Sequence, residues 1–184
     1  MLNIKKNGES LHIKGSRFMY AWMTVFVFGS LSACLFLIGE GFSFQSNYSL
    51  IYLGTGIVFL PYMSYLAIWF LPGFNPGKII LTIIPKEKGL VKSKNKTVLI
   101  KEIRTIDLIR NPLNLINDIV IESFDGKKFK IRTYNLIDEL DYEVMVDKYI
   151  YPYMSDNAKE VWDRKVNLEV LFEEVKYERE TIER

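Results

Sequence analysis

Two uncharged segments in the first half of the chain constrain its fold more than any other feature. No charged residue occurs from Phe18 to Gly39 or from Gly41 to Gly77, although 25% of all residues are charged. Within these segments, residues 18–38 and 50–71 are each long enough to form a helix of about 30 Å, the thickness of the hydrocarbon core of a bilayer. The sequence therefore predicts two transmembrane helices in residues 18–71, joined as a hairpin by the polar residues 39–49.

The distribution of charge predicts how this hairpin is oriented. Residues 1–17 carry a net charge of +3 and residues 78–110 carry +6, whereas residues 111–154 and residues 155–184 each carry −3. Basic residues collect at the cytoplasmic ends of membrane helices. We therefore expect a multi-pass protein of the cell membrane with both termini in the cytoplasm. Because the basic excess lies beside the apolar segments, we expect the lipid bilayer as a partner and no nucleic acid.

The single cysteine, Cys34, allows two interpretations. Residues 31–34 read Leu-Ser-Ala-Cys, which resembles a bacterial lipobox, the motif at which a lipoprotein signal peptide is cleaved and the cysteine is lipidated. The apolar run continues after Cys34, however, where a mature lipoprotein usually begins with a polar tether. We favour an uncleaved transmembrane helix and keep lipidation of Cys34 as the alternative.

Small residues in the two apolar segments predict how the helices pack. Gly29 and Ala33 are four residues apart, a spacing that lets a neighbouring helix approach closely, and Gly54 and Gly56 offer a matching surface. We expect these four residues to form the helix–helix contact. The alternative is that they reflect only the general abundance of small residues in membrane helices.

The chain after Lys78 has the pattern of a small antiparallel sheet followed by helices. Residues 79–133 are rich in short β-branched runs, and Asp125-Gly126 is a strong signal for a two-residue hairpin turn. We expect about six strands. A helix that begins at Asn135 as its N-cap and ends before Pro152 follows, with an apolar face formed by Ile137, Leu140, Val144 and Tyr151.

Two further segments flank this module. Residues 155–184 predict an amphipathic C-terminal helix with Val161, Leu168, Phe172 and Val175 on one face. We expect Glu160–Arg164 and Glu180–Arg184 to form i,i+4 ion pairs on this helix. Residues 1–17 form a tail in which Asn7-Gly8 separates two alternating segments, which predicts a β-hairpin that adds to the edge of the sheet. A tail without structure is the alternative.

The fold class is therefore α+β: a transmembrane two-helix hairpin, a small antiparallel β domain and C-terminal helices. The element order of residues 78–151 resembles the pleckstrin-homology-like (PH-like) domains of bacterial membrane proteins. The whole arrangement is similar to uncharacterised membrane proteins of Gram-positive spore formers, some of which are encoded beside secreted LXG-type toxins. The resemblance to PH-like domains implies a protein-binding or ligand-binding module.

The composition gives little support for catalysis. One cysteine and one histidine exclude an intramolecular disulfide and disfavour a zinc site. The sequence has no glycine-rich phosphate loop and no Ser-His-Asp order. The acidic residues Asp138, Glu139, Asp141 and Glu143 fit a solvated helix start better than a metal or acid–base site. We expect no enzyme, no cofactor and no metal.

A group of five lysines is the most distinctive charged feature: Lys86, Lys88, Lys92, Lys94 and Lys96. The resemblance to PH-like domains implies that the first loop is a ligand surface, so we expect these lysines to bind lipid headgroups or a partner. Near an anionic leaflet each lysine contributes about 1 kcal/mol. Ordinary solvated lysines that flank a membrane helix are the alternative.

Three functions fit these features. The first is a non-enzymatic, membrane-tethered interaction module that presents its cytoplasmic domain to a protein partner or to another copy of itself. The second is an accessory or immunity protein linked to a secreted or membrane-acting toxin. The third is a sensor that responds to anionic lipids through the five lysines.

Overall fold

Two antiparallel sheets form the centre of the strand-rich domain in this computed structural model, which describes residues 3–75, 77–94 and 96–179. The first sheet has the strand order β1-β2-β3-β4-β5 and the second has the order β6-β7-β8. Their bounds are β1 Asn3–Asn7, β2 Ser10–Lys14, β3 Ile79–Ile84, β4 Leu90–Ser93, β5 Lys96–Leu99, β6 Ile103–Arg110, β7 Asn117–Ser123 and β8 Lys128–Arg132. The sequence predicts an α+β fold and about six strands in residues 79–133. The described structure is α+β, and β3–β8 cover that segment.

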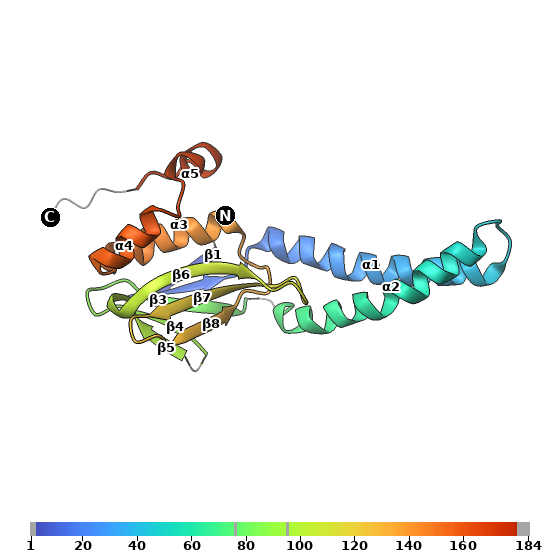
Figure 1. Cartoon of the computed structure of the whole chain (residues 1–184), viewed down its shortest axis with the longest axis horizontal. Coiled ribbons are helices and arrows are strands. Elements are labelled where there is room, and N and C mark those ends of the chain that lie inside the picture. Colours follow the sequence, from blue (N-terminus) through green and yellow to red (C-terminus); the bar gives the residue numbers. More distant parts are fainter. Residues whose placement is uncertain (1–2, 76, 95, 180–184) are drawn as a thin grey trace.

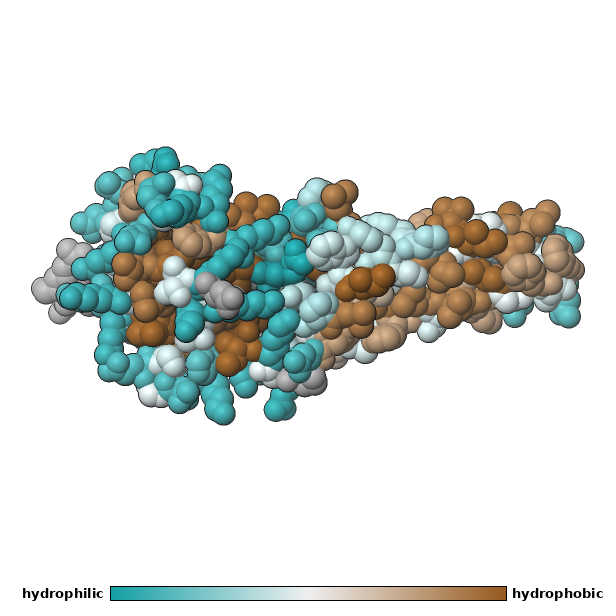
Figure 2. Space-filling model, turned by 90° about the horizontal axis from the view of Figure 1, so that it is seen from below, coloured by the Kyte–Doolittle hydropathy of each residue, from teal (hydrophilic) through white to brown (hydrophobic). Residues whose placement is uncertain are grey.

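Two long apolar helices form an arm that projects from one end of this domain (Figure 1). They are α1 (Arg17–Ser43) and α2 (Ser49–Phe70), joined by a loop shorter than the expected residues 39–49. In the most apolar 18-residue stretch of each helix, only 17% (α1) and 11% (α2) of the residues are buried. The two helices are therefore not core helices of a soluble domain. Figure 2 shows hydrophobic side chains along the arm and hydrophilic ones over much of the domain. By length and composition both helices can cross a membrane.

The N-terminal tail forms a β-hairpin that belongs to the first sheet. Strand β1 pairs with β2, and Gly8 adopts a left-handed conformation (φ 59°) in the turn between them. Strand β2 pairs in turn with β3, placing Leu11 opposite Ile83 and Ile13 opposite Leu81. Leu11 and Ile13 are buried. The sheet therefore combines strands from before and after the helical arm.

The core of the domain lies between the sheets and helix α3 (Glu139–Tyr149). β-Branched side chains dominate it, because they fit the pleated surface of a half-buried strand. Fully buried isoleucines come from both sheets and from the connection between β5 and β6, and include Ile83, Ile100, Ile103, Ile119 and Ile121. In Figure 1, α3 and α4 (Asp156–Asp163) lie on one side of the sheets.

Helix α3 begins later than the sequence indicated. Asp138, rather than Asn135, is the N-cap, and its carboxylate accepts a hydrogen bond from Asp141 N at 2.7 Å. Asn135 instead has a left-handed backbone (φ 54°), and its side chain bonds to the main chain of residues 115 and 117. The buried face of α3 is formed by Tyr142, Met145 and Val146, whereas Leu140 and Val144 are only partly buried.

The expected helix over residues 155–184 is two helices in the described part of that segment, α4 and α5 (Leu168–Val175). A new helix begins after Asn167, because the side chain of Asn167 caps α5 by accepting hydrogen bonds from Glu169 N and Val170 N. Trp162 of α4 and Leu171 of α5 are buried, whereas Leu168, Phe172 and Val175 of the expected face are 37–46% exposed. The expected Glu160–Arg164 pair forms at 3.7 Å. The expected Glu180–Arg184 pair lies outside the described residues.

Ile13→Ala tests the docking of the tail. Ile13 is fully buried between β1 and β3, so we expect the free energy of unfolding to fall by about 2–5 kcal/mol. Lys5→Ala on the exposed strand β1 is the control and should change it by less than about 0.5 kcal/mol. Urea unfolding of the full chain in detergent, followed by tryptophan fluorescence, measures both. An equal response of the two variants would contradict docking.

Candidate functional site

The end of the domain at which α1 and α2 join it, here called the hairpin junction, is tightly packed. Ser16 N donates a hydrogen bond to the carbonyl oxygen of Leu136 at 2.9 Å. A Cβ added to Gly15 would lie 2.7 Å from Leu136 Cβ, and one added to Gly73 would lie 2.7 Å from Tyr134 Cβ. Neither position has room for a side chain. The arm is therefore packed against the segment that links β8 to α3.

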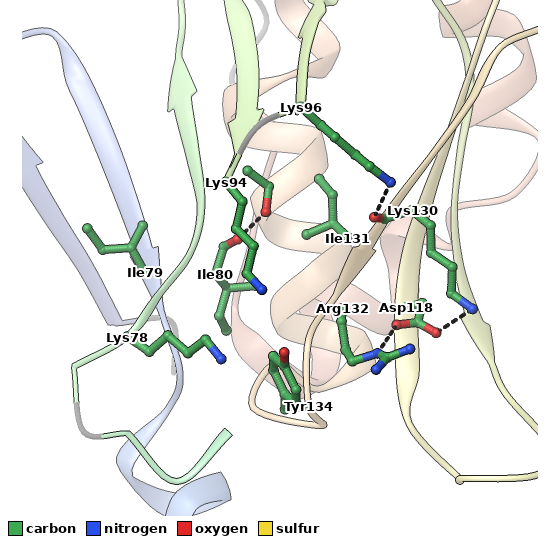
Figure 3. A pocket seen from close by; sticks show the side chains of 11 residues that line it. Lys78, Ile79, Ile80, Lys94, Lys96, Asp118, Lys130, Ile131, Arg132 and Tyr134 are labelled. Atoms are coloured by element: carbon green, nitrogen blue, oxygen red, sulfur yellow. Dashed lines mark hydrogen bonds and ion pairs between the residues drawn. The ribbon is translucent and has the colours of Figure 1, made fainter. Parts of the chain in front are cut away.

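A basic groove with a volume of about 460 Å³ opens at the hairpin junction, between the two sheets. Its charged side chains come from the start of β3, the β4–β5 turn, β7 and β8: Lys78, Lys94, Lys96, Asp118, Lys130 and Arg132. Figure 3 shows the ends of Lys78 and Lys94 directed toward a common space beside Tyr134, whereas Lys130 and Arg132 are directed toward Asp118. Five cationic side chains thus line the groove together with one carboxylate.

The groove lies beside the last turn of α2. The guanidinium of Arg132 is 4.7 Å from the centre of the Trp69 ring, a cation–π distance. The ammonium of Lys78 is 4.0 Å from the centre of the Tyr134 ring and also donates to the carbonyl oxygen of Pro72. These contacts connect the basic groups of the domain directly to the end of the arm.

The single carboxylate positions two of the cations. Asp118 is 1% exposed, and its oxygens lie 2.8 Å from Lys130 Nζ and 3.5 Å from Arg132 Nε. Asp118 and Arg132 are direct partners in the β7–β8 register. A buried carboxylate is stable only when it is paired, so this ion pair fixes part of one wall. Within the described part of the chain, no carboxylate pairs with Lys78, Lys94 or Lys96.

The five lysines expected from the sequence do not form one surface. Lys94 and Lys96 belong to the groove, because β4 returns toward the start of β3, where Ser93 Oγ donates to the carbonyl oxygen of Ile80 at 2.9 Å. Lys86 and Lys88 lie beyond the other end of β3, where Lys86 pairs with Glu9. Lys92 is exposed on β4, outside the groove. Proximity in sequence did not indicate which lysines meet in space.

Sequence reasoning missed the other three cations of the groove, Lys78, Lys130 and Arg132. Lys78 is 52 residues before Lys130 in the sequence, and only the pairing of strands brings them together. The available signal was the alternation in β8, where the basic residues Lys128, Lys130 and Arg132 occupy one face and Ile131 the other. Lys94 adds a local feature: its φ of 48° costs a lysine about 1–2 kcal/mol.

The expected helix-packing residues require correction. The contact between α1 and α2 passes through Met23, Val27, Cys34 and Gly41 on α1 and Gly56 and Leu66 on α2, all of them buried. Cys34 is 6% exposed, and a Cβ on Gly56 would lie 2.9 Å from its carbonyl oxygen. Gly29 and Gly54 have open space where a Cβ would be, and Ala33 is exposed. The repeat of small residues therefore lies off the contact, and of the four expected residues only Gly56 is in it.

A second charged cluster, which the sequence did not indicate, holds the C-terminal segment. The buried carboxylate of Asp147 accepts hydrogen bonds from Trp162 Nε1 (2.9 Å), Tyr177 Oη (2.8 Å) and Arg179. Burial alone would lower the pKa of Arg179, but its bonds to Asp147 and Asp163 outweigh this and raise the pKa. The cluster connects α3, α4 and the chain after α5.

The acidic residues at the start of α3 are less solvated than expected. Asp141 is 7% exposed, and Glu143 is partly buried. Burial, reinforced by Glu139 and Asp147, raises the pKa of the Glu143 carboxyl. Among the described residues, no three His, Cys, Asp or Glu side chains are grouped so that they could hold a metal ion.

Comparison with known proteins shows the family. A model for a family of unknown function (DUF5381) matches residues 9–172, nearly the whole chain. The chain belongs to the DUF5381 family. No solved structure matches it.

Two Bacillus subtilis (strain 168) proteins are similar to this DUF5381 protein. One, named "Uncharacterized lipoprotein YfjD", is 32% identical over 162 residues, which cover 85% of this chain and 88% of that protein. The other, named "Uncharacterized protein YfjE", is 30% identical over 130 residues, covering 68% of this chain and 86% of that protein. The expected similarity to uncharacterised proteins of Gram-positive spore formers is confirmed.

Gly56→Ala tests the helix contact of this DUF5381 protein, with Gly54→Ala as its matched control. The new methyl group at residue 56 would lie 2.6 Å from Ile38 Cγ1, so the helices must separate, at a cost of about 1–3 kcal/mol. Residue 54 has space for a methyl group. We expect faster maleimide labelling of Cys34 in detergent for Gly56→Ala only. Unchanged labelling in both variants would show that the arm is not packed in this way.

Proposed function

We propose that this protein is a non-enzymatic interaction module of the cell membrane, in which the arm crosses the bilayer twice and the strand-rich domain lies at the cytoplasmic face. The observation that carries the proposal is the position of the arm within the sheet. Strands β2 and β3 are hydrogen-bonded neighbours, yet α1 and α2 lie between them in the sequence. A domain connected in this way is held at the membrane surface by two chain segments and cannot drift from it as on a flexible linker.

The charge distribution supports a cytoplasmic domain. The basic groove lies at the hairpin junction, and further basic residues, Lys14 and Arg17, flank the start of α1. Loop residues 44–48 between α1 and α2 contain no lysine or arginine. With basic groups on the cytoplasmic side, the domain and both termini lie in the cytoplasm.

We also propose that α1 is not cleaved at Cys34, although the name of one relative includes the word lipoprotein. Cleavage there would remove β1 and β2, and with them the buried Leu11 and Ile13. Cys34 itself is buried against α2 in the middle of an uninterrupted helix. An intact first segment is a structural part of the cytoplasmic domain.

A PH-like architecture is the fold that we propose for this domain. Strands β2–β5 are four consecutive strands of the five-stranded first sheet, β6–β8 form the three-stranded second sheet, and α3 packs against their core. Residues 78–151 alone supply six strands, and β2 from the tail supplies a seventh. The arm is then an insertion between the first two strands of the PH-like unit.

Helix α5 is the surface that we propose for a protein partner. Its exposed apolar side chains Leu168, Phe172 and Val175 lie among acidic residues, and an open groove passes along Phe172, Glu169 and Glu173. Acidic surroundings disfavour an anionic lipid surface, and Figure 1 places α5 on the far side of α3 and α4 from the sheets. The partner that fits is a protein segment with both apolar and basic side chains.

Tags at both ends of one chain test the membrane arrangement. We expect a single full-length band that carries both tags, and both tags should resist protease in intact protoplasts and be digested after permeabilisation. A band that has lost the N-terminal tag would show cleavage near Cys34, and digestion of either tag in intact cells would contradict the proposed orientation.

Site-specific photo-crosslinking tests the partner surface. A photoreactive amino acid at Phe172 should give a discrete adduct in cells, and Glu169→Lys with Glu173→Lys should reduce it about tenfold, since the complementary charge is reversed. The same probe at the exposed Lys127, in the β7–β8 turn, is the control. No adduct at Phe172, or an adduct that persists after charge reversal, would contradict this partner. An adduct of twice the chain mass would identify a second copy instead.

A further inference from the structure

We propose that the basic groove at the hairpin junction binds the phosphate of an anionic phospholipid headgroup. The inference deepens the proposed function, because it supplies the cytoplasmic domain with a ligand from its own membrane. It differs from the expectation based on the sequence, which placed binding on the run from Lys86 to Lys96.

The charge of the groove favours an anion. Five cationic side chains surround it, and the one carboxylate, Asp118, is engaged with Lys130 and Arg132. Like charges so close together repel one another, so an anion between them is stabilised. Lysine and arginine donors together suit phosphate oxygens, since an ammonium supplies a compact charge and a planar guanidinium can donate two parallel hydrogen bonds.

The shape of the groove suits a small polar group with an apolar attachment. Its volume of about 460 Å³ is in the usual range for small-molecule sites. Ile80 and Ile131 contribute buried apolar surface beside the cations, and the Tyr134 ring lies below them (Figure 3). A glycerol backbone could lie against these side chains while the phosphate meets the ammonium and guanidinium groups.

The location of the groove favours a lipid over a soluble phosphate. Arg132 contacts Trp69 in the last turn of α2, and Lys78 contacts the carbonyl oxygen of Pro72 just after it. In the proposed arrangement this turn lies at the cytoplasmic interface, where tryptophan rings and headgroup phosphates are found at the same depth. A headgroup therefore reaches the cations without leaving the bilayer.

The site separates two sets of lysines that the sequence places together. Lys94 and Lys96 line the groove, whereas Lys86 and Lys88 lie beyond the opposite end of β3. The pair Lys94→Asn with Lys96→Gln removes two groove cations. Asparagine tolerates the left-handed backbone of residue 94 better than lysine does, so this variant should keep its fold. The pair Lys86→Gln with Lys88→Gln removes the same charge elsewhere.

Native mass spectrometry of the full chain in detergent, with phosphatidylglycerol and phosphatidylcholine at equal concentrations, tests the inference. We expect the unaltered protein to retain phosphatidylglycerol preferentially, the groove pair to weaken this retention about tenfold, and the control pair to leave it unchanged. Lys78→Gln, which removes one further groove cation, should weaken it too and serves if the groove pair fails to fold. Added sn-glycerol 1-phosphate at the same concentration should not displace the lipid.

Three outcomes would overturn the inference: no preference for phosphatidylglycerol, equal weakening by both lysine pairs, or displacement by sn-glycerol 1-phosphate. The last would identify a site for soluble phosphates. Failure here is distinguishable from failure of the proposed membrane arrangement. Retention in detergent does not depend on the orientation of the chain, whereas protease protection of the tags does not depend on the groove.

Discussion

The pairing of β2 with β3 is the interaction on which the rest of the structure depends. It joins residues 11–14 to residues 79–83, across the whole helical arm. Neighbouring strands lie about 4.8 Å apart, so the chain leaves and re-enters the sheet at adjacent points, and the start of α1 lies beside the end of α2. The close contacts at Gly15 and Gly73 then hold both helix ends against the domain. The arm and the sheet are thus rigidly connected, so a change in the tilt of α1 and α2 would displace β2 and β3.

The same pairing accounts for the position of the groove. Because β3 begins at the hairpin junction, Lys78 lies there, and the antiparallel return of β4 brings Lys94 and Lys96 to the same end. The second sheet contributes through the β7–β8 register, which sets Asp118 opposite Arg132. The cations come from both sheets, so the groove requires the complete domain. A ligand there would contact both sheets and the end of the arm at once.

Local sequence patterns predicted which segments form helices and strands. Contacts between distant residues determine which helix faces are buried and which side chains form the groove. Hydrophobic runs predicted two long helices and about six strands, and Asn7-Gly8 indicated the hairpin, because each of these signals lies within a few residues. The buried faces of α3, α4 and α5 could not be predicted in this way. Asn135 bonds to the main chain of residues 115 and 117 instead of capping a helix, and Trp162 rather than Leu168 enters the core.

The prediction of the helix-packing residues was wrong for a similar reason. Gly29 and Gly54 are small enough for a close helix contact, but the path of the partner helix brings only Gly56 into it. For the groove, the sequence indicated Lys94 and Lys96 but could not separate them from Lys86 and Lys88.

The short motif around Cys34 shows why such non-local contacts matter for function. Residues 31–34 resemble a cleavage signal. Cleavage there is compatible with a folded domain only when residues 1–33 are dispensable, and here residues 1–33 supply β2. Removing β2 would lose the burial of Leu11 and Ile13 and uncover the edge strand carrying Leu81 and Ile83, all at most 5% exposed. At about 1.5–3 kcal/mol for each buried side chain, the upper limit of the loss is about 6–12 kcal/mol. The whole stability of a domain of this size is about 5–15 kcal/mol. Cleavage at Cys34 would therefore remove contacts comparable in free energy to the stability of the domain that the arm is proposed to hold at the membrane.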